Sequence, residues 1–309
     1  MDRIVVAGSL NMDLVAVASH IPAPGETVLG REFFQAPGGK GGNQAYAAAR
    51  LGGFASMLGR VGSDDLGRIL KANLEAAGCD ASQVKAAPGS SGVALISIDD
   101  AGQNSILVAP GANALYAPSD FAQDAHVLAG AGLLLLQLEI PMETVIAAAS
   151  AGRRAGARVI LDPAPAPEAL SAELCRHVDI LTPNEVEAAQ LLGETAERLS
   201  LAEAEAIAGR LLTTGVGAVI VKLGPQGCLV ADGRTMSRIP APAVDAVDTT
   251  AAGDVFNGAL AVALAEQAGL LDACRFAVHA AAMSVTRIGA QPSMPFRDEV
   301  DRWMAGALA

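Results

Sequence analysis

The sequence predicts an α/β fold in which a mostly parallel central sheet lies between layers of helices. A chain of 309 residues is long enough to bury a substantial core. Hydrophobic residues make up 51% of it and charged residues 17%, which excludes the composition of a disordered chain. Short β-branched or leucine-rich runs alternate with alanine-rich runs at helical spacing, as is typical of repeated βαβ units.

Six short apolar runs are expected to form the strands of this sheet. Each is almost continuously apolar, which is typical of parallel strands covered by helices on both faces. The expected strands are residues 3–11, 54–61, 133–139, 158–162, 179–182 and 218–223.

The segments between these strands are expected to form the crossover helices. Ser200 is followed three residues later by Glu203, which predicts a capping box at the start of one of them. The expected helices are residues 43–51, 64–77, 142–155, 202–213, 253–268 and 271–285.

Two segments, residues 13–34 and 92–108, break this alternation and predict a small β-sheet lid. Residues 92–108 alternate in polarity around a central DDAGQN turn, which is typical of hairpin strands rather than of a crossover. No internal repeat or low-complexity linker interrupts the chain. We therefore expect residues 1–309 to form a single domain, with the lid inserted in its N-terminal third.

Charge and cysteine content restrict the partners and the compartment. The 21 Lys and Arg residues against 33 Asp and Glu residues give a net charge of −12, which disfavours nucleic acid and anionic membranes as partners. The four cysteines match neither a CxxC metal site nor a secreted disulfide framework, and no signal peptide or membrane span is recognisable. We expect a cytoplasmic protein.

The most specific segment for chemistry is AVDTTAAGDVFNGAL, residues 246–260. A helix that begins near Ala252 would direct its free N–H groups at an anion, with Asp254 in its first turn facing the same point. An anion cradle beside a carboxylate suits phosphoryl transfer to a hydroxyl group. The alternative is a tight loop in which Asp254 only starts the helix.

A glycine cluster, PGGKGGNQ at residues 37–44, precedes an alanine-rich helix. It is neither a Walker A sequence nor a GxGxxG fingerprint, so nucleotide binding through those motifs is disfavoured. Its glycines would allow the backbone, Lys40 and Asn43 to approach a polyhydroxylated ligand. The alternative is a plain turn at the entry to the helix.

Polar residues also follow the strands, at the edge where open α/β sheets bind their ligands. Asn11 and Asp13 are spaced so that both lie on one side of an extended chain, and Glu139 ends another strand. Asn184 and Glu187 are spaced to orient hydrated magnesium or, alternatively, to cap a helix.

The VKLGPQG segment, residues 221–227, follows the last strong strand. Its glycines would admit a flat ligand against the backbone, or they form a simple hairpin turn. The four histidines are scattered and form no hydrolase or zinc motif, so those classes lack support from the sequence.

With these motifs, the chain resembles the PfkB family of sugar kinases from its first strand to nearly its last helix. The resemblance implies a ribokinase-like three-layer sandwich and ATP-dependent phosphorylation of D-ribose at the 5-hydroxyl, with the lid closing over the sugar. The motifs that carry it are GSLNMD (8–13), PGET (24–27), GGKGGNQA (38–45), GVALI (92–96), QLEIP (137–141), DPAPA (162–166), TPNE (182–185), residues 246–260 and VTRIGAQPS (285–293).

The same resemblance implies roles for individual residues. Asp254 would be the base that accepts the proton of the primary hydroxyl. The residues expected to form the anion hole are Ala251, Ala252 and Gly253. Those expected to hold the sugar hydroxyls are Asn11, Asp13, Gly39, Lys40, Asn43 and Glu139.

Nucleotide and metal sites are implied in the same way. Glu187 would act on magnesium through water, together with Asn184, and a potassium ion would activate the enzyme. The residues expected at the nucleotide are Asn184, Lys222, Gly224, Gly227 and His279. Those expected around potassium, largely through backbone oxygens, are Asp248, Thr250, Ser284, Arg287, Gly289 and Ser293.

The chain departs from the family pattern at three places, which affects the expected nucleotide contacts most. Asp162 stands where many relatives have Asn, Lys222 where some have Thr, and His279 in a stretch where relatives often place Asn against adenine. The alternatives are a PfkB kinase for another sugar or a nucleoside, and a sugar-binding regulator without catalysis. Exposed lid edges favour a homodimer formed through the lid strands.

Overall fold

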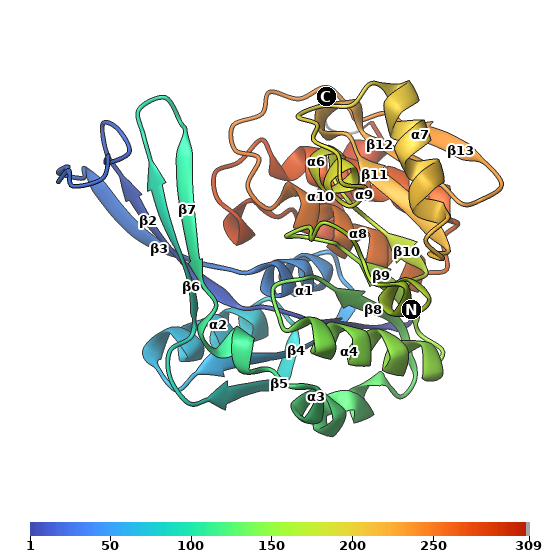
Figure 1. The fold of residues 1–309 in the computed structure, drawn as a ribbon, viewed down its shortest axis with the longest axis horizontal. Coiled ribbons are helices and arrows are strands. Elements are labelled where there is room, and N and C mark those ends of the chain that lie inside the picture. The colour runs from blue at the N-terminus through green and yellow to red at the C-terminus, as the bar shows by residue number, and fades with distance from the viewer. Residues whose placement is uncertain (307–309) are drawn as a thin grey trace.

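The computed structural model describes residues 1–306 and contains a nine-stranded sheet with helices on both faces (Figure 1). Neighbouring strands run parallel from β5 to β11, and β12 and β13 add an antiparallel edge. In spatial order the strands are β13 (Met236–Ile239), β12 (Cys228–Ala231), β11 (Ala218–Lys222), β10 (Ile180–Leu181), β9 (Arg158–Leu161), β8 (Ala131–Leu136), β1 (Arg3–Ala7), β4 (Phe54–Gly62) and β5 (Asp80–Ala87).

The helices cover the sheet in two layers, and successive residues of one strand enter different cores. Leu133 and Leu135 of β8 pack in the core beneath α1, α8 and α9, whereas Leu134 and Leu136 pack in the core beneath α4 and α7. The α-helices are α1 (Lys40–Arg50), α2 (Asp65–Ala76), α3 (Pro118–Asp124), α4 (Met142–Arg154), α5 (Ala172–Cys175), α6 (Glu185–Gln190), α7 (Leu201–Leu212), α8 (Ala252–Ala265), α9 (Leu270–Ser284) and α10 (Arg297–Met304). The predicted α/β sandwich is therefore confirmed.

Each of the six helices expected from the sequence is present, with ends displaced by at most three residues. The capping box at the start of α7 is also present, because Ser200 Oγ accepts from the Glu203 N–H and Glu203 accepts from the Ser200 N–H. The short helices α3, α5 and α10 were not predicted, and α6 was expected only as the alternative in which Asn184 caps a helix.

One expected strand is wrong in its extent. Residues 3–11 form two strands in different sheets, because β1 ends at Ala7 and the chain turns at Gly8 before β2 (Asn11–Val17) begins. The turn leaves room for α1, since a Cβ at Gly8 would lie 3.0 Å from the Cα of Gly41. Strands β5, β12 and β13 were also not predicted.

A second, four-stranded sheet projects from the main body and is called the lid sheet here (Figure 1). In spatial order it contains β3 (Glu32–Gly38), β2, β6 (Gly92–Ile98) and β7 (Asn104–Ala109). Strands β6 and β7 form the antiparallel hairpin predicted within residues 92–108. The other lid segment, expected at residues 13–34, differs in its extent. Residues 18–31 contain no strand, and β3 continues past residue 34 to Gly38.

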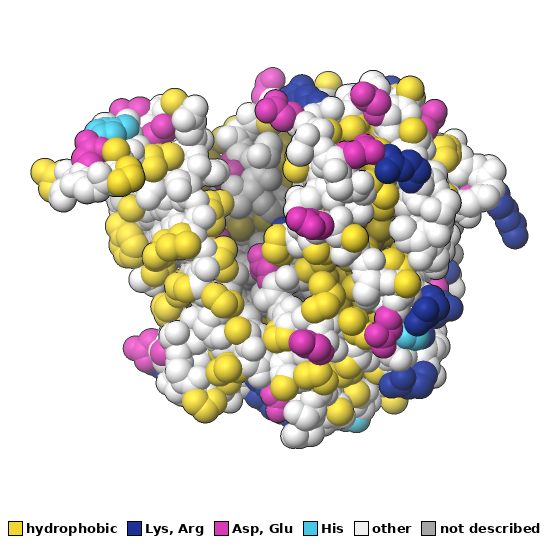
Figure 2. Space-filling model, viewed as in Figure 1, with side chains coloured by type: hydrophobic (Ala, Val, Ile, Leu, Met, Phe, Trp, Pro, Cys, Tyr) yellow, Lys and Arg dark blue, Asp and Glu magenta, His cyan; other side chains and the backbone are white. Residues whose placement is uncertain are grey.

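The lid sheet leaves apolar side chains on its surface (Figure 2). Leu14, Leu95 and Leu107 pair in register across β2, β6 and β7, so they share one face of the sheet. Leu107 is 65% exposed. Asp13 and Val108 lie on the opposite face, because they are one position away in the same register.

Two further features concern membrane-spanning helices and cysteines. Among residues 1–306, no helix is long and apolar enough to cross a membrane. All four cysteines are buried and unpaired.

Candidate active site

The start of α1 lies against the end of β1, where glycines permit close contact. Gly39 precedes the helix with φ 84°, a left-handed conformation that favours glycine. A side chain there would also meet the backbone of Asn11 at 2.6 Å. The carboxylate of Glu139 accepts from the Lys40 N–H at 3.2 Å and from Ser9 Oγ at 2.6 Å, so it is fixed at the positive end of α1.

Asp254 lies in the first turn of α8 and faces α1. It is 6% exposed and accepts hydrogen bonds from Asn43 Nδ2 at 2.9 Å and from Gln44 Nε2 at 3.1 Å. Burial raises its pKa to about 6, and Asp162 acts in the same direction, whereas the Lys40 ammonium opposes the rise. A buried carboxylate with this pKa is ionised at neutral pH and is suited to accept a proton.

The N–H groups expected to bind an anion lie at the start of α8, but one of them, that of Ala252, is already hydrogen-bonded. Ala251, its N-cap, has φ 60°, a left-handed conformation that is rare for a residue other than glycine. The Ala252 and Asp254 N–H groups donate to Thr249 and Ala251 carbonyls. Within the described part of the chain, the Gly253 N–H has no hydrogen-bond acceptor, so it remains available to an anion.

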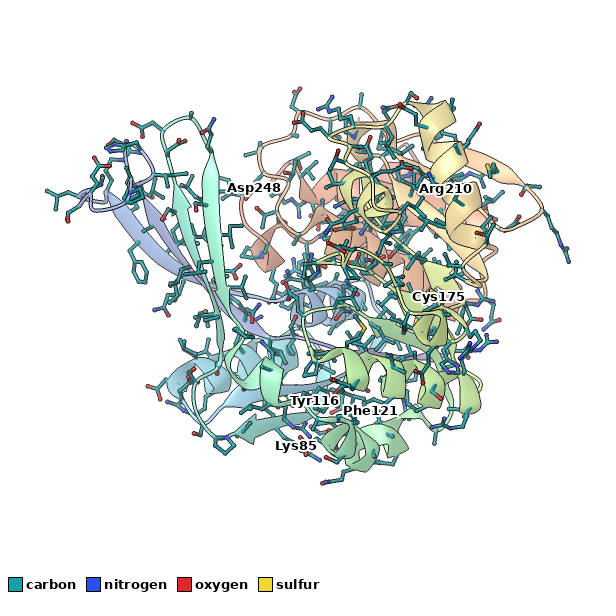
Figure 3. The ribbon with its side chains drawn as sticks, in the orientation of Figure 1. Lys85, Tyr116, Phe121, Cys175, Arg210 and Asp248 are labelled. Atoms are coloured by element: carbon teal, nitrogen blue, oxygen red, sulfur yellow. The ribbon has the colours of Figure 1, made fainter. Side chains whose placement is uncertain are left out.

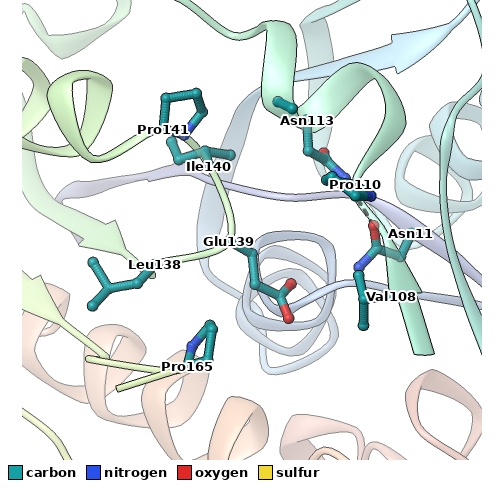
Figure 4. A pocket seen from close by; sticks show the side chains of 10 residues that line it. Asn11, Val108, Pro110, Asn113, Leu138, Glu139, Ile140, Pro141 and Pro165 are labelled. Carbon is teal, nitrogen blue, oxygen red and sulfur yellow. Dashed lines mark hydrogen bonds between the residues drawn. The ribbon is translucent and has the colours of Figure 1, made fainter. Parts of the chain in front are cut away.

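A cavity of about 410 Å³ lies between the lid sheet and the segments that follow β8 and β9 (Figure 4). Its polar lining includes Asn11, Asn113 and Glu139, and its apolar lining includes Val108 and Pro165. Asn113 Nδ2 donates to Asn11 Oδ1 at 2.7 Å, which directs the donor end of the Asn11 amide away from Asn113. A cavity with a few convergent polar groups is typical of a small-molecule site.

Four charged groups interact electrostatically in this region, and one of them, Glu139, lines the cavity. Burial, together with the nearby carboxylates of Glu139 and Asp254, raises the pKa of Asp13 to about 6. Burial alone would lower the pKa of the Lys40 ammonium, but Asp254, Asp162 and Glu139 together raise it above its ordinary value. The predicted sugar-binding residues therefore lie together with the predicted base, in one electrostatically coupled group.

The structure adds residues to which the sequence reasoning assigned no role. Asn113 is buried and holds Asn11, and Gln44 bridges Asp254 and Asp162 through its Nε2 atom. Gln44 lies in the glycine motif and Asp162 in the DPAPA motif. These motifs predicted the region of the site, but not the hydrogen bond between the two side chains. Asn113 follows the predicted lid hairpin and has no comparable motif.

Asn184 and Glu187 form the helix cap that was left open as the alternative. Asn184 Oδ1 accepts from the Glu187 N–H, and Glu187 Oε2 accepts from the Asn184 N–H, both at 2.8 Å. Burial raises the pKa of Glu187, while Lys222 opposes the rise. The other carboxylate oxygen, Oε1, has no hydrogen-bond partner within the described part of the chain, so it is free to bind a hydrated cation.

Two of the predicted nucleotide residues, Asn184 and Lys222, lie side by side in an isolated β-bridge, whereas His279 lies on α9. Lys222 ends β11, and Gly224 and Gly227 form the turn that leads into the antiparallel strand β12. His279 packs edge-on against Trp303, with ring centroids 5.5 Å apart, and its Nδ1 lies 2.8 Å from the Arg275 carbonyl oxygen.

The residues expected around potassium lie on two segments, 248–250 and 284–293, which Asp248 connects by hydrogen bonds. Asp248 is labelled in Figure 3. Its carboxylate accepts from the Thr250 N–H at 2.9 Å and from the Gly289 N–H at 2.8 Å. The Arg287 side chain instead pairs with Glu299 at 2.7 Å. The hydroxyls of two other residues bond to carbonyls of their own helical turns, namely Ser284 and Ser293.

A family model described as pfkB family carbohydrate kinase matches residues 1–297. This chain belongs to the PfkB family. It is 40% identical to a ribokinase of Bacillus subtilis over 306 residues, which is 99% of this chain and 100% of the relative. The resemblance inferred from the motifs is therefore confirmed.

Solved structures of PfkB-type kinases agree with this assignment. A ribokinase of Thermotoga maritima superposes with a TM-score of 0.90 at 40% identity, covering 99% of this chain and 100% of the other. A ribokinase of Arabidopsis thaliana, described as complexed with ribose and ATP, gives 0.90 at 35% identity, covering 97% and 98%. This PfkB chain therefore has the ribokinase-like fold over its full described length.

Proposed function

We propose that this PfkB kinase transfers the γ-phosphoryl group of ATP to the 5-hydroxyl of D-ribose and releases D-ribose 5-phosphate and ADP. The observation that carries the proposal is the position of Asp254, which is buried in the first turn of α8 and coupled electrostatically to Asp13 and Lys40. The Lys40 N–H in turn binds Glu139, which lines the cavity. The similarity to ribokinases over nearly the whole chain supports ribose as the acceptor.

In this reaction Asp254 accepts the proton of the 5-hydroxyl while the hydroxyl oxygen forms its bond to the γ-phosphorus. The bond between that phosphorus and the bridging oxygen breaks, and the electron pair leaves on ADP. The Gly253 N–H and the positive end of α8 stabilise the charge on the phosphoryl oxygens. The transition state of phosphoryl transfer is loose, so a carboxylate with a pKa of about 6 is a sufficient base.

Sugar binding would use polar groups from both the main body and the lid sheet. The Asn11 amide donates, and the Asp13 and Glu139 carboxylates accept, so together they match hydroxyl groups that both donate and accept. Asp13 lies on the lid sheet, whereas Glu139 lies on the main body. Closure of the lid sheet over ribose would complete the hydrogen bonds and exclude water.

Two cations fit the residues present. Glu187 would hold magnesium through water, because one carboxylate oxygen is free and Mg²⁺ often keeps several waters. The magnesium neutralises charge on the ATP phosphates. Potassium would bind between the two loops that Asp248 joins, ahead of the start of α8.

We further propose that two copies pair through their lid sheets in the cytoplasm. The face that carries Leu14, Leu95 and Leu107 points away from Asp13 and is exposed, so a second copy would bury it. Analytical ultracentrifugation should give a dimer for the wild type and a monomer for Leu107→Asp. A wild-type monomer at micromolar concentration would contradict the dimer.

A substrate panel tests the main proposal. ADP release is measured with ATP, magnesium and potassium present and with ribose, deoxyribose, fructose or a nucleoside as acceptor. The proposal expects the highest kcat/KM for ribose. A higher value for another acceptor would support the alternative of a PfkB kinase for that substrate, and no turnover with any acceptor would support a non-catalytic sugar-binding regulator.

A further inference from the structure

A buried ion pair lies between the strand ends and α8. Nζ of Lys222, at the end of β11, is 3.0 Å from Oδ1 of Asp162, which follows β9. The two side chains are 13% and 3% exposed. Such a pair seldom adds net stability, because the loss of hydration of both charges offsets their attraction. Stability therefore does not explain why the pair is present.

The ammonium of Lys222 lies against the first turn of α8. A Cβ placed on Gly253 would be 3.2 Å from Lys222 Nζ, with no other neighbour closer. An ammonium group has three N–H donors, and within the described part of the chain its only acceptor is Asp162. Two donors thus remain free, beside the unbonded N–H of Gly253.

A hydrogen-bond chain connects this pair with the base. Asp162 Oδ2 accepts from Gln44 Nε2 at 3.0 Å, and the same nitrogen donates to Asp254 Oδ1 at 3.1 Å. Gln137 Nε2 donates to Gln44 Oε1 at 2.7 Å, which sets the orientation of the Gln44 amide. Because Gln44 and Gln137 are both buried, the ammonium and the base are held in one fixed arrangement.

We propose that Lys222 is a catalytic residue that donates from Nζ to an oxygen of the phosphoryl group during its transfer, and that Asp162 is the positioning residue that holds Nζ there. The inference rests on the proposed function and deepens it. Negative charge is spread over the equatorial oxygens of the transferred group, and a preorganised cation stabilises such charge strongly. This role differs from a contact that only borders the nucleotide.

The first test compares Lys222→Met with Lys71→Met, a control that removes a lysine ammonium from α2. Lys71 donates to the Val84 carbonyl and touches none of the site residues. With ribose as acceptor, kcat of Lys222→Met should fall about 10²–10³-fold. Its ribose KM and its affinity for ADP, measured by calorimetry, should change less than about threefold, and Lys71→Met should keep the wild-type kcat. Unchanged kcat, or a loss confined to ADP affinity, would overturn the proposal.

The double variant Asp162→Asn/Lys222→Met separates catalysis from charge balance. If Lys222 only neutralises Asp162, removal of both charges restores the wild-type kcat, which would overturn the proposal. If Lys222 acts on the phosphoryl group, the double variant stays as slow as Lys222→Met. Asp162→Asn alone should lower kcat and leave ribose KM nearly unchanged, because the ammonium loses its anchor.

Failure of the proposed function gives a different result. In that case the wild type releases no ADP with ribose, and the same variants are compared with the acceptor that the wild type does phosphorylate. A Lys222→Met variant that is as fast as the wild type on that acceptor overturns the role of Lys222. A wild type that phosphorylates no acceptor overturns both proposals.

Discussion

Strands β8 and β7 are both apolar, yet their side chains have opposite environments. In β8, AGLLLL, five of the six residues are buried, whereas in β7, NSILVA, all six are exposed. Helices cover β8 on both sides, whereas β7 stands apart from the helices of residues 1–306 (Figure 1). The same kind of sequence therefore builds a rigid core in the central sheet and an uncovered surface in the lid sheet.

The two sheets also contribute differently to the site. The main body supplies groups held by buried hydrogen bonds, such as Asp254 and Glu139, while the lid sheet supplies Asp13. The main body is thus preorganised, and the lid sheet would close over the ligand. This arrangement suits phosphoryl transfer to the sugar without hydrolysis of ATP.

The largest expected effect is a loss of kcat when the base in the main body is replaced. Asp254→Asn should lower kcat for ribose phosphorylation about 10²–10⁴-fold, because a positioned general base contributes on this scale. Asp272→Asn is the matched control, since Asp272 lies in the first turn of the neighbouring helix α9. It should keep the wild-type kcat, and both variants should bind ADP. An Asp254→Asn variant with wild-type kcat would exclude the assigned base.

The difference between the two sheets also predicts unequal stabilities. Leu135→Ala leaves a cavity in the core and should lower the free energy of unfolding by about 2–5 kcal/mol. Leu107→Ala on the lid should change it by less than about 0.5 kcal/mol for the separated monomer. Denaturant unfolding at low protein concentration measures both. Equal losses would mean that the lid sheet is as tightly packed as the core.

A smaller effect is expected from the lid side of the site. Asp13→Ala should weaken ribose binding by about 1–3 kcal/mol, because sugar hydroxyls buried without their partner lose a hydrogen bond. Binding of ATP should change much less. Calorimetric titration with each ligand separates the two, and equal losses would remove Asp13 from the sugar site.

The raised pKa values predict how activity depends on pH. Asp13 and Asp254 each have a pKa raised to about 6 from an ordinary value of 3.8. Both become protonated as the pH falls through 6, so kcat/KM should decline more steeply than tenfold per pH unit below that value. Asp13→Asn should reduce the slope to about tenfold per unit. A profile that is flat from pH 5 to 8 would contradict both ionisations.

The same two groups act on stability with the opposite sign. A carboxyl whose folded pKa lies above its unfolded value binds more protons when folded between pH 4 and 6. The two groups therefore destabilise the folded protein above pH 6, and that contribution vanishes as the pH falls towards 4. Asp13→Asn should remove the destabilising contribution of Asp13. The difference in the free energy of unfolding between this variant and the wild type should therefore be smaller at pH 5 than at pH 7.

The smallest expected effect concerns the monovalent cation. Potassium should raise kcat over sodium at equal ionic strength, because under the proposal the larger ion would span the two loops joined by Asp248 and would fix the start of α8. Charge screening alone predicts no difference between the two salts. Asp248→Ala should abolish the preference, and an unchanged preference in that variant would place the cation elsewhere.

The sequence was most informative for strands that are buried on both faces, because such strands appear as continuous apolar runs. The run at residues 133–136 is apolar because both of its faces enter a core, so β8 was predictable. The break after Ala7 was not, because it depends on how closely α1 packs against Gly8. Strand β5 is an edge strand with alternating exposed residues, so it lacks an apolar run.

The same limit applies to the site. Motifs predicted the position of Asp254 at the start of α8, because a local run of small residues marks it. The bridge from Gln44 to Asp162 joins residues 118 positions apart, and the contact of Asn113 with Asn11 spans 102. Such contacts depend on the register of the strands, which no local pattern in the chain specifies.

Product analysis tests the central claim most directly. The wild-type enzyme is incubated with ribose and ATP, and phosphorus NMR measures sugar phosphate and inorganic phosphate against ADP. We expect one phosphorus on the 5-oxygen of ribose for each ADP released, and almost no inorganic phosphate. Inorganic phosphate formed in proportion to ADP, or phosphorus on another oxygen of ribose, would contradict the account.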